Sequence, residues 1–318
     1  MSRPVSFVCL SALLLLASVP AAADSAGRTP LFADTEFQGG FNLSAVDASH
    51  KPVEIGRMLA SNPDKPPRWR LCQWGTRFSL ENTPELAGPD GARTRENSGK
   101  AVRVFPEGMK GGGLWFEVKG GEEYGGRLRQ YGESWPHLLL EQRLPDIPVD
   151  KFSAMPFQVE FMVAKCDATV KEGLDPGLHT AHVNAFFTVH NGNAESPDHN
   201  DMIWFGLPLY DARYDIPIGH QALDVGQANA TNKFICSMDG AKFFNQPVVV
   251  GKWHTLDCDL VPLLREALAA SQARGFLATT RFEDLILTTF NLGWEVPGPY
   301  DCAVHLRHLT LEGAQKGE

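Results

Sequence analysis

The sequence predicts an all-β fold, a jelly-roll sandwich with one short helix before its last two strands. Short runs rich in β-branched and aromatic residues recur along the chain of 318 residues. Clusters of Gly, Pro, Asn and Asp separate these runs, as at 61–67 and 86–99, and such clusters form turns. Many short strands joined by turns are typical of β-sandwiches and jelly rolls.

The N-terminus has the pattern of a secretory signal peptide over residues 1–23. Arg3 precedes an apolar run at 5–19, and Ala21-Ala22-Ala23 fits a cleavage site. The run is short for a membrane span, and no later run approaches about 18 apolar residues. We therefore expect a secreted or periplasmic protein with one domain over 24–318, ordered from about residue 30.

The charge and the cysteines exclude several classes of function. A net charge of −9 repels nucleic acid and anionic membranes, so neither is an expected partner. Of the six cysteines, only Cys9 lies in the expected signal peptide. An odd number therefore remains, as buried thiols or partly as disulfides. We find no nucleotide-binding glycine loop, catalytic serine elbow or metal-ligand spacing, and expect no cofactor and no metal.

Three of the expected strands carry polar side chains on one face. Residues two apart share a face of a strand. The shared faces hold Trp135, His137, Leu139, Glu141 and Arg143; His182, Asn184, Phe186, Thr188 and His190; and Leu287, Thr289, Asn291, Gly293 and Glu295. Such a face is either the solvated side of a sheet or a ligand groove. Trp135 and Phe186 favour a groove for sugars, because aromatic rings stack on sugars while carboxylates and amides bind the hydroxyls.

The segment 259–275 differs from the rest of the chain. Leu260, Leu264, Ala267 and Leu268 have helical spacing, and Gly275 is a suitable end. One helix is therefore expected between the many strands and the last two.

Several motifs, in order from about 180 to 318, resemble those of glycoside hydrolase family 12. Met202-Ile203-Trp204 followed by Phe205-Gly206 is similar to the strand of that family that carries the nucleophile. Asn184-Ala185-Phe186-Phe187-Thr188, Pro217-Ile218-Gly219 and Gly293-Trp294-Glu295-Val296-Pro297 resemble its neighbouring segments. The resemblance implies a concanavalin-A-like jelly roll whose concave face binds β-glucan-like chains.

The resemblance places the acid/base glutamate of the family on Glu295, its nucleophile on Asn200 and its assisting aspartate on Asn184. Retaining glycosidases need a carboxylate nucleophile, and an amide forms no ester intermediate. Asp201 is adjacent to Asn200, but its side chain points to the other face unless a β-bulge turns it back. It is either a replacement nucleophile or a solvated residue at the start of a strand.

Glu141 offers a second route to an acid/base pair, because it shares a face with Trp135 and His137. The alternative is a salt bridge with Arg143 or Arg127. We expect substrate binding by aromatic and polar side chains of the same strands: Trp135, His137, Asn184, Asn200, Trp204 and Asn291.

A third reading comes from the segment 122–137. It concentrates side chains that polysaccharide lyases use on jelly rolls: Tyr124, Arg127, Arg129, Tyr131 and His137. The alternative is a charged rim of a hairpin. The sequence thus predicts a carbohydrate-active protein, first a glycan hydrolase with Glu295 as acid/base, with Asp201 or Glu141 as its partner. A non-catalytic carbohydrate-binding jelly roll and a polysaccharide lyase are the alternatives.

Overall fold

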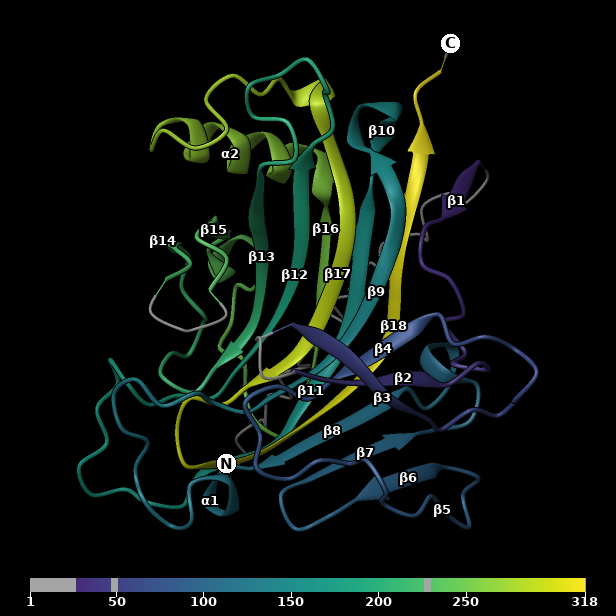
Figure 1. The fold of residues 1–318 in the computed structure, drawn as a ribbon, viewed down its shortest axis with the longest axis vertical. Helices are drawn as coiled ribbons and strands as arrows, with labels where there is room; N and C mark the ends of the chain where they lie inside the picture. The colour runs from purple at the N-terminus through teal and green to yellow at the C-terminus, as the bar shows by residue number, and fades with distance from the viewer. Residues whose placement is uncertain (1–26, 47–50, 226–229, 318) are drawn as a thin grey trace, which may run out of the picture.

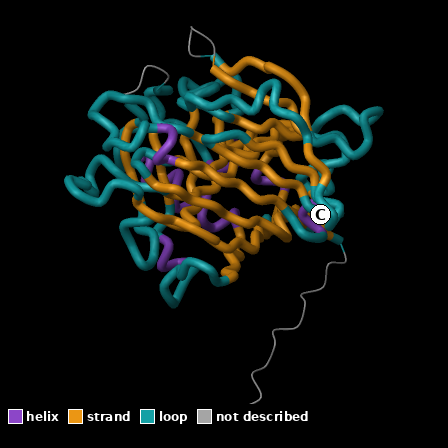
Figure 2. Tube along the Cα trace, turned by 90° about the horizontal axis from the view of Figure 1, so that it is seen from below, coloured by secondary structure: helices purple, strands orange, loops and turns teal. Residues whose placement is uncertain are grey.

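The computed structural model describes residues 27–46, 51–225 and 230–317. The predicted signal peptide at 1–23 lies outside these residues. The protein is a jelly-roll sandwich of two large, curved β-sheets (Figure 1), which confirms the predicted fold class. Strands fill the centre of the molecule and loops lie around its margins (Figure 2).

Sheet one has β18 near its middle. In order across the sheet, its strands are β16 (Trp253–Asp259), β11 (Pro156–Ala168), β18 (Tyr300–Gln315), β8 (Leu114–Lys119), β7 (Lys100–Val104), β6 (Arg93–Glu96) and β5 (Leu86–Ala87). Two short strands, β1 (Arg28–Pro30) and β10 (Phe152–Ala154), also pair with β18.

Sheet two contains the polar strands that the sequence singled out. In order, its strands are β14 (His220–Leu223), β15 (Phe234–Ser237), β13 (Met202–Asp211), β12 (His182–Asn191), β17 (Leu285–Glu295), β9 (His137–Pro148), β4 (Trp69–Cys72), β2 (Phe41–Val46) and β3 (Pro52–Met58). The strands β12, β17 and β9 are therefore consecutive neighbours, and each pair is antiparallel.

The core lies between the two sheets and follows from alternation along the strands. In β12, Val183, Ala185, Phe187 and Val189 are fully buried, while His182 and Asn184 are half-buried on the outer face. Phe187 packs against Phe290 of β17 with ring centroids 4.9 Å apart. Burying each such side chain contributes about 2 kcal/mol of hydrophobic free energy. The predicted division of β12 into an apolar and a polar face is therefore correct.

The predicted helix is α2 (Leu260–Gln272), which lies directly before β17 and β18 in the chain. It begins where the Asp259 side chain accepts a hydrogen bond from the amide of Val261. Its buried face, including Leu260, Leu264 and Ala267, packs against β13, β15 and β10. The other helices are short: α1 (Gly120–Glu123), and the 3₁₀ turns η1 (Gly108–Lys110), η2 (Val149–Lys151), η3 (Gly240–Lys242) and η4 (Phe282–Asp284).

One predicted face is wrong at the start of β17. Leu287 is fully buried in the core, although the sequence placed it on the polar face with Thr289. The pairing of β17 with β9 shifts between Leu287 and Thr289. Such a bulge inserts a residue and reverses the alternation on one side of it. From Thr289 to Glu295 the predicted alternation holds.

Among residues 27–46, 51–225 and 230–317, no helix is long and apolar enough to cross a membrane. The five cysteines in these ranges are free thiols, and Cys72, Cys236 and Cys302 are buried.

Candidate active site

A row of polar side chains crosses four strands at one end of sheet two. Glu295 of β17 lies opposite His182 of β12 and opposite His137 of β9. His182 in turn lies opposite Asp211 of β13. Directly opposed residues in antiparallel strands share a face of the sheet. All four side chains therefore belong to the outer face, away from the core.

Three donors meet at one oxygen of Glu295. The Oε2 atom is 3.3 Å from Nε2 of His137 and 3.5 Å from Nε2 of His182. The indole Nε1 of Trp135 donates to the same atom over 3.3 Å. The Oε1 atom takes part in none of these three contacts. We call Trp135, His137, His182 and Glu295 the Glu295 cluster.

The cluster is accessible from the outer face. The side chains of His137, His182 and Glu295 are 18%, 19% and 21% exposed. All three side chains are therefore partly exposed to solvent on this face. Such partial burial strengthens the interactions within the cluster without closing it to solvent.

The backbone around the cluster is fixed by hydrogen bonds and close packing. The amide of His137 donates to the carbonyl of Trp74, and the amide of Val296 donates to Pro136. At Gly293 a β-carbon would approach the carbonyl oxygen of Leu138 to 2.2 Å. Any larger residue there would push β9 away from β17, so glycine is required beside the site.

A buried arginine supports Trp135 from the side. The guanidinium of Arg129 lies 5.2 Å from the centroid of the Trp135 ring. Its Nε donates to the carbonyl of Pro297, and its two Nη atoms donate to Glu133 and Leu178. The ring of His137 stacks on Trp135 at 5.8 Å. Trp135 and His137, the two neighbours of Glu295 on the β9 side, are thus held in place by packing and hydrogen bonds within the protein.

The electrostatics of the cluster favour separated charges. Burial pushes the pKa of Glu295 upward, but the hydrogen bonds and positive charges of His137 and His182 hold it well below its ordinary range. Burial likewise pushes the pKa of His182 downward, but Glu295 raises it above its ordinary value. Glu295 is therefore a carboxylate, and it favours the imidazolium form of His182.

Both ring nitrogens of His137 have a partner. Its Nδ1 lies 3.0 Å from the carbonyl oxygen of Trp135, and because a carbonyl only accepts, this contact needs a proton on Nδ1. Its Nε2 faces Oε2 of Glu295. The imidazole is therefore held between the carbonyl of Trp135 and the carboxylate of Glu295.

Asp211 extends the row but is already paired. Its carboxylate binds Nη2 of Arg213 at 2.5 Å and accepts a hydrogen bond from Thr180 over 2.7 Å. Burial raises its pKa, but these partners and His182 lower it below the ordinary value. Two strand spacings separate Asp211 from Glu295, a distance of about 10 Å between backbones.

Glu141 lies on the same outer face but does not meet Glu295. It is opposite Asn291, four residues before Glu295 on β17, which corresponds to about 13 Å along the strand. Its carboxylate forms a close ion pair with Arg70 and is 3.7 Å from Sγ of Cys72. The partner of Glu141 is thus Arg70, rather than the Arg143 or Arg127 of the sequence-based alternative.

Asn200 and Asp201 lie at the other end of the sheet. They precede β13, whereas Asp211 in the row of Glu295 ends it, so about 30 Å separates Asp201 from the Glu295 cluster. Asp201 forms an ion pair of 2.7 Å with Lys233. The structure therefore brings neither residue within the spacing that a glycosidase pair needs.

The other predicted binding residues are spread along the outer face. Asn184 lies opposite Gly293, which is two residues before Glu295 on β17. The buried Asn291 lies two residues further from Glu295 on the same strand. Trp204 is further still, and its indole donates to Thr231. Only Trp135 and His137 of the predicted binding residues contact Glu295.

The segment expected of a lyase is mostly structural. The hydroxyl of Tyr124 donates to the carbonyl of Val296, and burial raises the pKa of Tyr124. Arg127 pairs with Glu133, and Tyr131 is 90% exposed. Of the five side chains named for a lyase, only His137 contacts Glu295. Arg129 is linked to Glu295 indirectly, because it packs on Trp135.

Sequence reasoning missed His182 as the partner of Glu295. The signal that finds it is topological, since His182 begins one strand and Glu295 ends another. If those strands are antiparallel neighbours, both residues lie at the same end of the sheet. Within the described part of the chain, no group of three or more His, Cys, Asp or Glu side chains is arranged to hold a metal ion.

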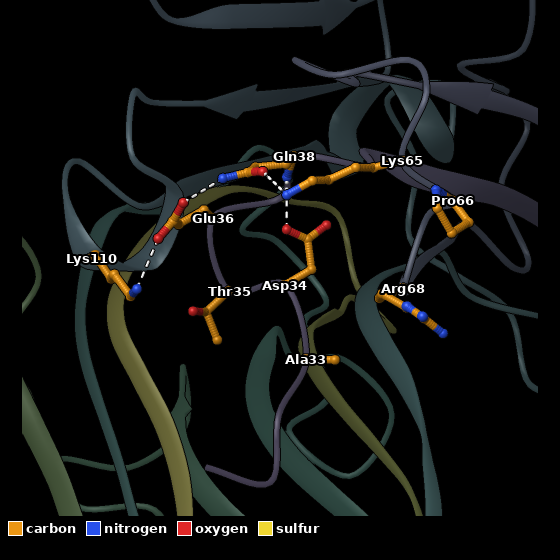
Figure 3. A pocket seen from close by; sticks show the side chains of 9 residues that line it. All are labelled: Ala33, Asp34, Thr35, Glu36, Gln38, Lys65, Pro66, Arg68 and Lys110. Atoms are coloured by element: carbon orange, nitrogen blue, oxygen red, sulfur yellow. Dashed lines mark hydrogen bonds and ion pairs between the residues drawn. The ribbon is translucent and has the colours of Figure 1, made fainter.

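A hollow of about 480 Å³ lies outside this row, at the segment 33–38 and at residues 65–68 (Figure 3). Its charged groups largely satisfy one another. Glu36 binds Lys110 at 2.8 Å and accepts from Gln38 at 2.6 Å. None of the Glu295 cluster lines it, so it is separate from that cluster.

Solved structures similar to this one include family 12 and family 11 glycoside hydrolases, at remote similarity. The endoglucanase Cel12A from Rhodothermus marinus is 12% identical, with a TM-score of 0.35, over 71% of this chain and 95% of that chain. The family 11 xylanase from Neocallimastix patriciarum is 9% identical, with a TM-score of 0.36, over 73% and 95%. The family 12 xyloglucanase from Bacillus licheniformis is 8% identical, with a TM-score of 0.37, over 72% and 96%. No protein-family model and no curated protein sequence matches this chain.

Proposed function

We propose that this protein is a secreted or periplasmic enzyme that cleaves polysaccharide chains lying across the outer face of sheet two. The observation that carries the proposal is the meeting of Trp135, His137 and His182 at one oxygen of Glu295. The outer face beside the cluster offers amides and aromatic rings, including Asn184 and Phe186, for sugar hydroxyls and ring faces.

The cluster supplies the transferred proton. In the imidazolium form, His182 donates a proton to the oxygen of the bond that breaks, and Glu295 stabilises the charged imidazole. This alters the expectation that Glu295 itself is the acid, because its lowered pKa makes it a poor proton donor. Glu295 acts as the group that favours the imidazolium form of His182, and His137 holds the carboxylate from the other side.

For hydrolysis, Asp211 is the carboxylate of the row that could activate water, because it lies opposite His182 on β13. In this reaction His182 donates the proton and Asp211 takes a proton from the attacking water. Its pairing with Arg213 weakens Asp211 as a base.

That pairing favours β-elimination as a second candidate reaction. Elimination from a uronate-containing glycan needs one proton-transfer centre. A base takes the proton next to the sugar carboxylate, a C=C bond forms, and the glycosidic oxygen leaves with a proton. One neutral imidazole of the cluster is a suitable base, and the other, as imidazolium, would neutralise the sugar carboxylate.

The experiment is a product screen with the full mature chain on neutral β-glucans, xyloglucan, xylans and uronate-containing glycans. Hydrolysis releases reducing ends alone, whereas elimination also gives unsaturated products that absorb ultraviolet light. The His137→Ala and His182→Ala variants are run beside the wild type, with Asp201→Asn as a control at the distant end of the sheet. Binding without any turnover would contradict the proposal and favour a carbohydrate-binding module.

A further inference from the structure

A second row of side chains, rich in aromatic rings, crosses the outer face of sheet one. His305 of β18 lies opposite Trp115 of β8 and opposite Met162 of β11. Met162 lies opposite Trp253 of β16, and Trp115 lies opposite Arg103 of β7. Because the two sheets enclose the core between them, this row faces away from the Glu295 cluster.

The rings in and beside this row are packed against one another. Phe105 stacks on His305 with centroids 4.9 Å apart, and Trp253 lies 5.0 Å from the same ring. Trp115 meets His305 edge-on at 6.1 Å. His305 also forms a short hydrogen bond with the carbonyl of Gly112. We call Phe105, Trp115, Trp253 and His305 the aromatic row; Phe105 directly follows β7 and the other three lie on the strands named above. Because the rings pack against one another, their arrangement does not depend on a ligand.

A hollow of about 240 Å³ opens beside this row, with polar side chains around it. Phe105, Trp115 and His305 line it together with Glu96, Glu117 and Arg103. Nε of Arg103 donates to Thr94. Beyond the hollow, the guanidinium of Arg307 covers the Trp253 ring at 3.9 Å and donates to Glu160. Trp253 remains 37% exposed.

We propose that the aromatic row is a second binding surface for a neutral polysaccharide chain. A contiguous patch of apolar rings on a solvated sheet face is the kind of surface that marks an interaction site, unlike single exposed apolar residues. Sugar rings present an apolar C–H face to aromatic rings, and their hydroxyl edges pair with carboxylates and guanidinium groups. Two glutamates and one arginine beside the hollow disfavour an anionic chain.

The dimensions suit an extended chain rather than a single sugar. The backbones of Trp253 and Trp115 are three strand spacings, about 14 Å, apart, and their rings lie on either side of the His305 ring, with centroids 5.0 and 6.1 Å from it. This inference rests on the proposed function for the kind of polymer that it names. A surface on the opposite side of the sandwich would hold the polymer without blocking the Glu295 cluster, and so keep the enzyme on an insoluble substrate.

The test uses the full mature chain with the variants Trp253→Ala and Trp115→Ala. Thr255→Ala is the matched control, since Thr255 is exposed and shares the face of Trp253 on β16. Thermal unfolding shows whether each variant is folded, and Trp253→Phe, which keeps an aromatic ring, should retain most binding. Retention is measured on insoluble cellulose and insoluble xylan, and by gel mobility in soluble β-glucan.

We expect each alanine variant to weaken retention about ten-fold, the effect of losing one aromatic contact. Thr255→Ala and Glu295→Gln should retain wild-type binding by this surface, and turnover of short oligosaccharides should not change in Trp253→Ala. Unchanged retention in both tryptophan variants would overturn the inference. So would a concentration-dependent dimer that Trp253→Ala abolishes, because a second copy would then be the occupant.

The outcomes separate this inference from the proposed function. Retention that depends on Trp253 in a protein without turnover would support the surface and contradict the enzyme. If the protein cleaves polysaccharide and its retention is unchanged in Trp253→Ala and Trp115→Ala, the proposed enzyme is supported and the second binding surface is contradicted.

Discussion

Glu295 and His182 face each other directly across β17 and β12, with Oε2 and Nε2 3.5 Å apart. His137 completes the arrangement from β9 on the other side of Glu295. One carboxylate therefore lies between two imidazoles on three consecutive strands, and each histidine adjoins the same negative charge. The chemistry that we propose depends on this relationship.

The Glu295→Gln substitution should lower the pKa of His182. Burial lowers that pKa, whereas Glu295 and, to a smaller extent, Asp211 raise it. Without the carboxylate of Glu295, burial and Arg213 are opposed by Asp211 alone, so we expect the pKa of His182 to fall relative to the wild type. An NMR titration of the imidazole C–H signals measures it, with His182→Ala used to assign the resonance. A pKa as high in Glu295→Gln as in the wild type would disprove the coupling.

The same pair predicts how stability depends on pH. The lowered pKa of Glu295 stabilises the fold above the ordinary value of 4.5, and this is lost as the pH falls through the folded-state pKa. The raised pKa of His182 stabilises the fold below 6.5, and this is lost as the pH rises through its folded-state pKa. Both contributions are complete only between these two ordinary values.

Glu295→Gln should therefore be most destabilising near the middle of that window. We expect a loss of about 1.5 kcal/mol in unfolding free energy at about pH 5.5, the size of a hydrogen bond to a charged group. At about pH 9 the loss should be smaller. Urea unfolding of wild type and variant at both pH values measures the difference. An equal loss of unfolding free energy at both pH values would show that the charge of His182 is not coupled to that of Glu295.

A buried ion pair behind sheet one gives a stability prediction away from the site. The fully buried Lys100 donates to Thr76 over 2.6 Å, and its Nζ is 3.8 Å from Oε1 of Glu123. Lys100→Met leaves the buried carboxylate of Glu123 without its cation, at a cost of about 3 kcal/mol or more. The double variant Lys100→Met with Glu123→Gln should lose clearly less in urea unfolding. Equal losses would mean that the charge of Glu123 is unimportant.

Most of the fold can be predicted from the sequence because the strands and the helix depend on local patterns of apolar and polar residues. Alternation along β12 separates Phe187 from Asn184 correctly, and helical spacing finds α2 within a few residues of its ends. The error at Leu287 comes from a bulge, which depends on pairing with β9 and leaves no local sign in the sequence.

The site was only partly predictable, since it depends on which strands are neighbours and in which direction they run. Glu295 and His137 were found on polar faces, but alternation along one strand gives no cross-strand register. The resemblance to family 12 motifs led to the prediction that Asn200 and Asp201 lie near Glu295. The antiparallel course of β12 and β13 places them about 30 Å from it instead. The same topology brings His182 to Glu295.

Turnover by Glu295→Gln on the glycan that the wild type cleaves tests the central claim most directly. The amide keeps the shape of the side chain but removes the charge that stabilises the imidazolium, so we predict a fall in kcat of about 100-fold or more, the usual contribution of acid–base catalysis. Asp201→Asn and Glu141→Gln, which change carboxylates outside the cluster, should keep kcat near the wild-type value. A Glu295→Gln variant that turns over as fast as the wild type would contradict the account.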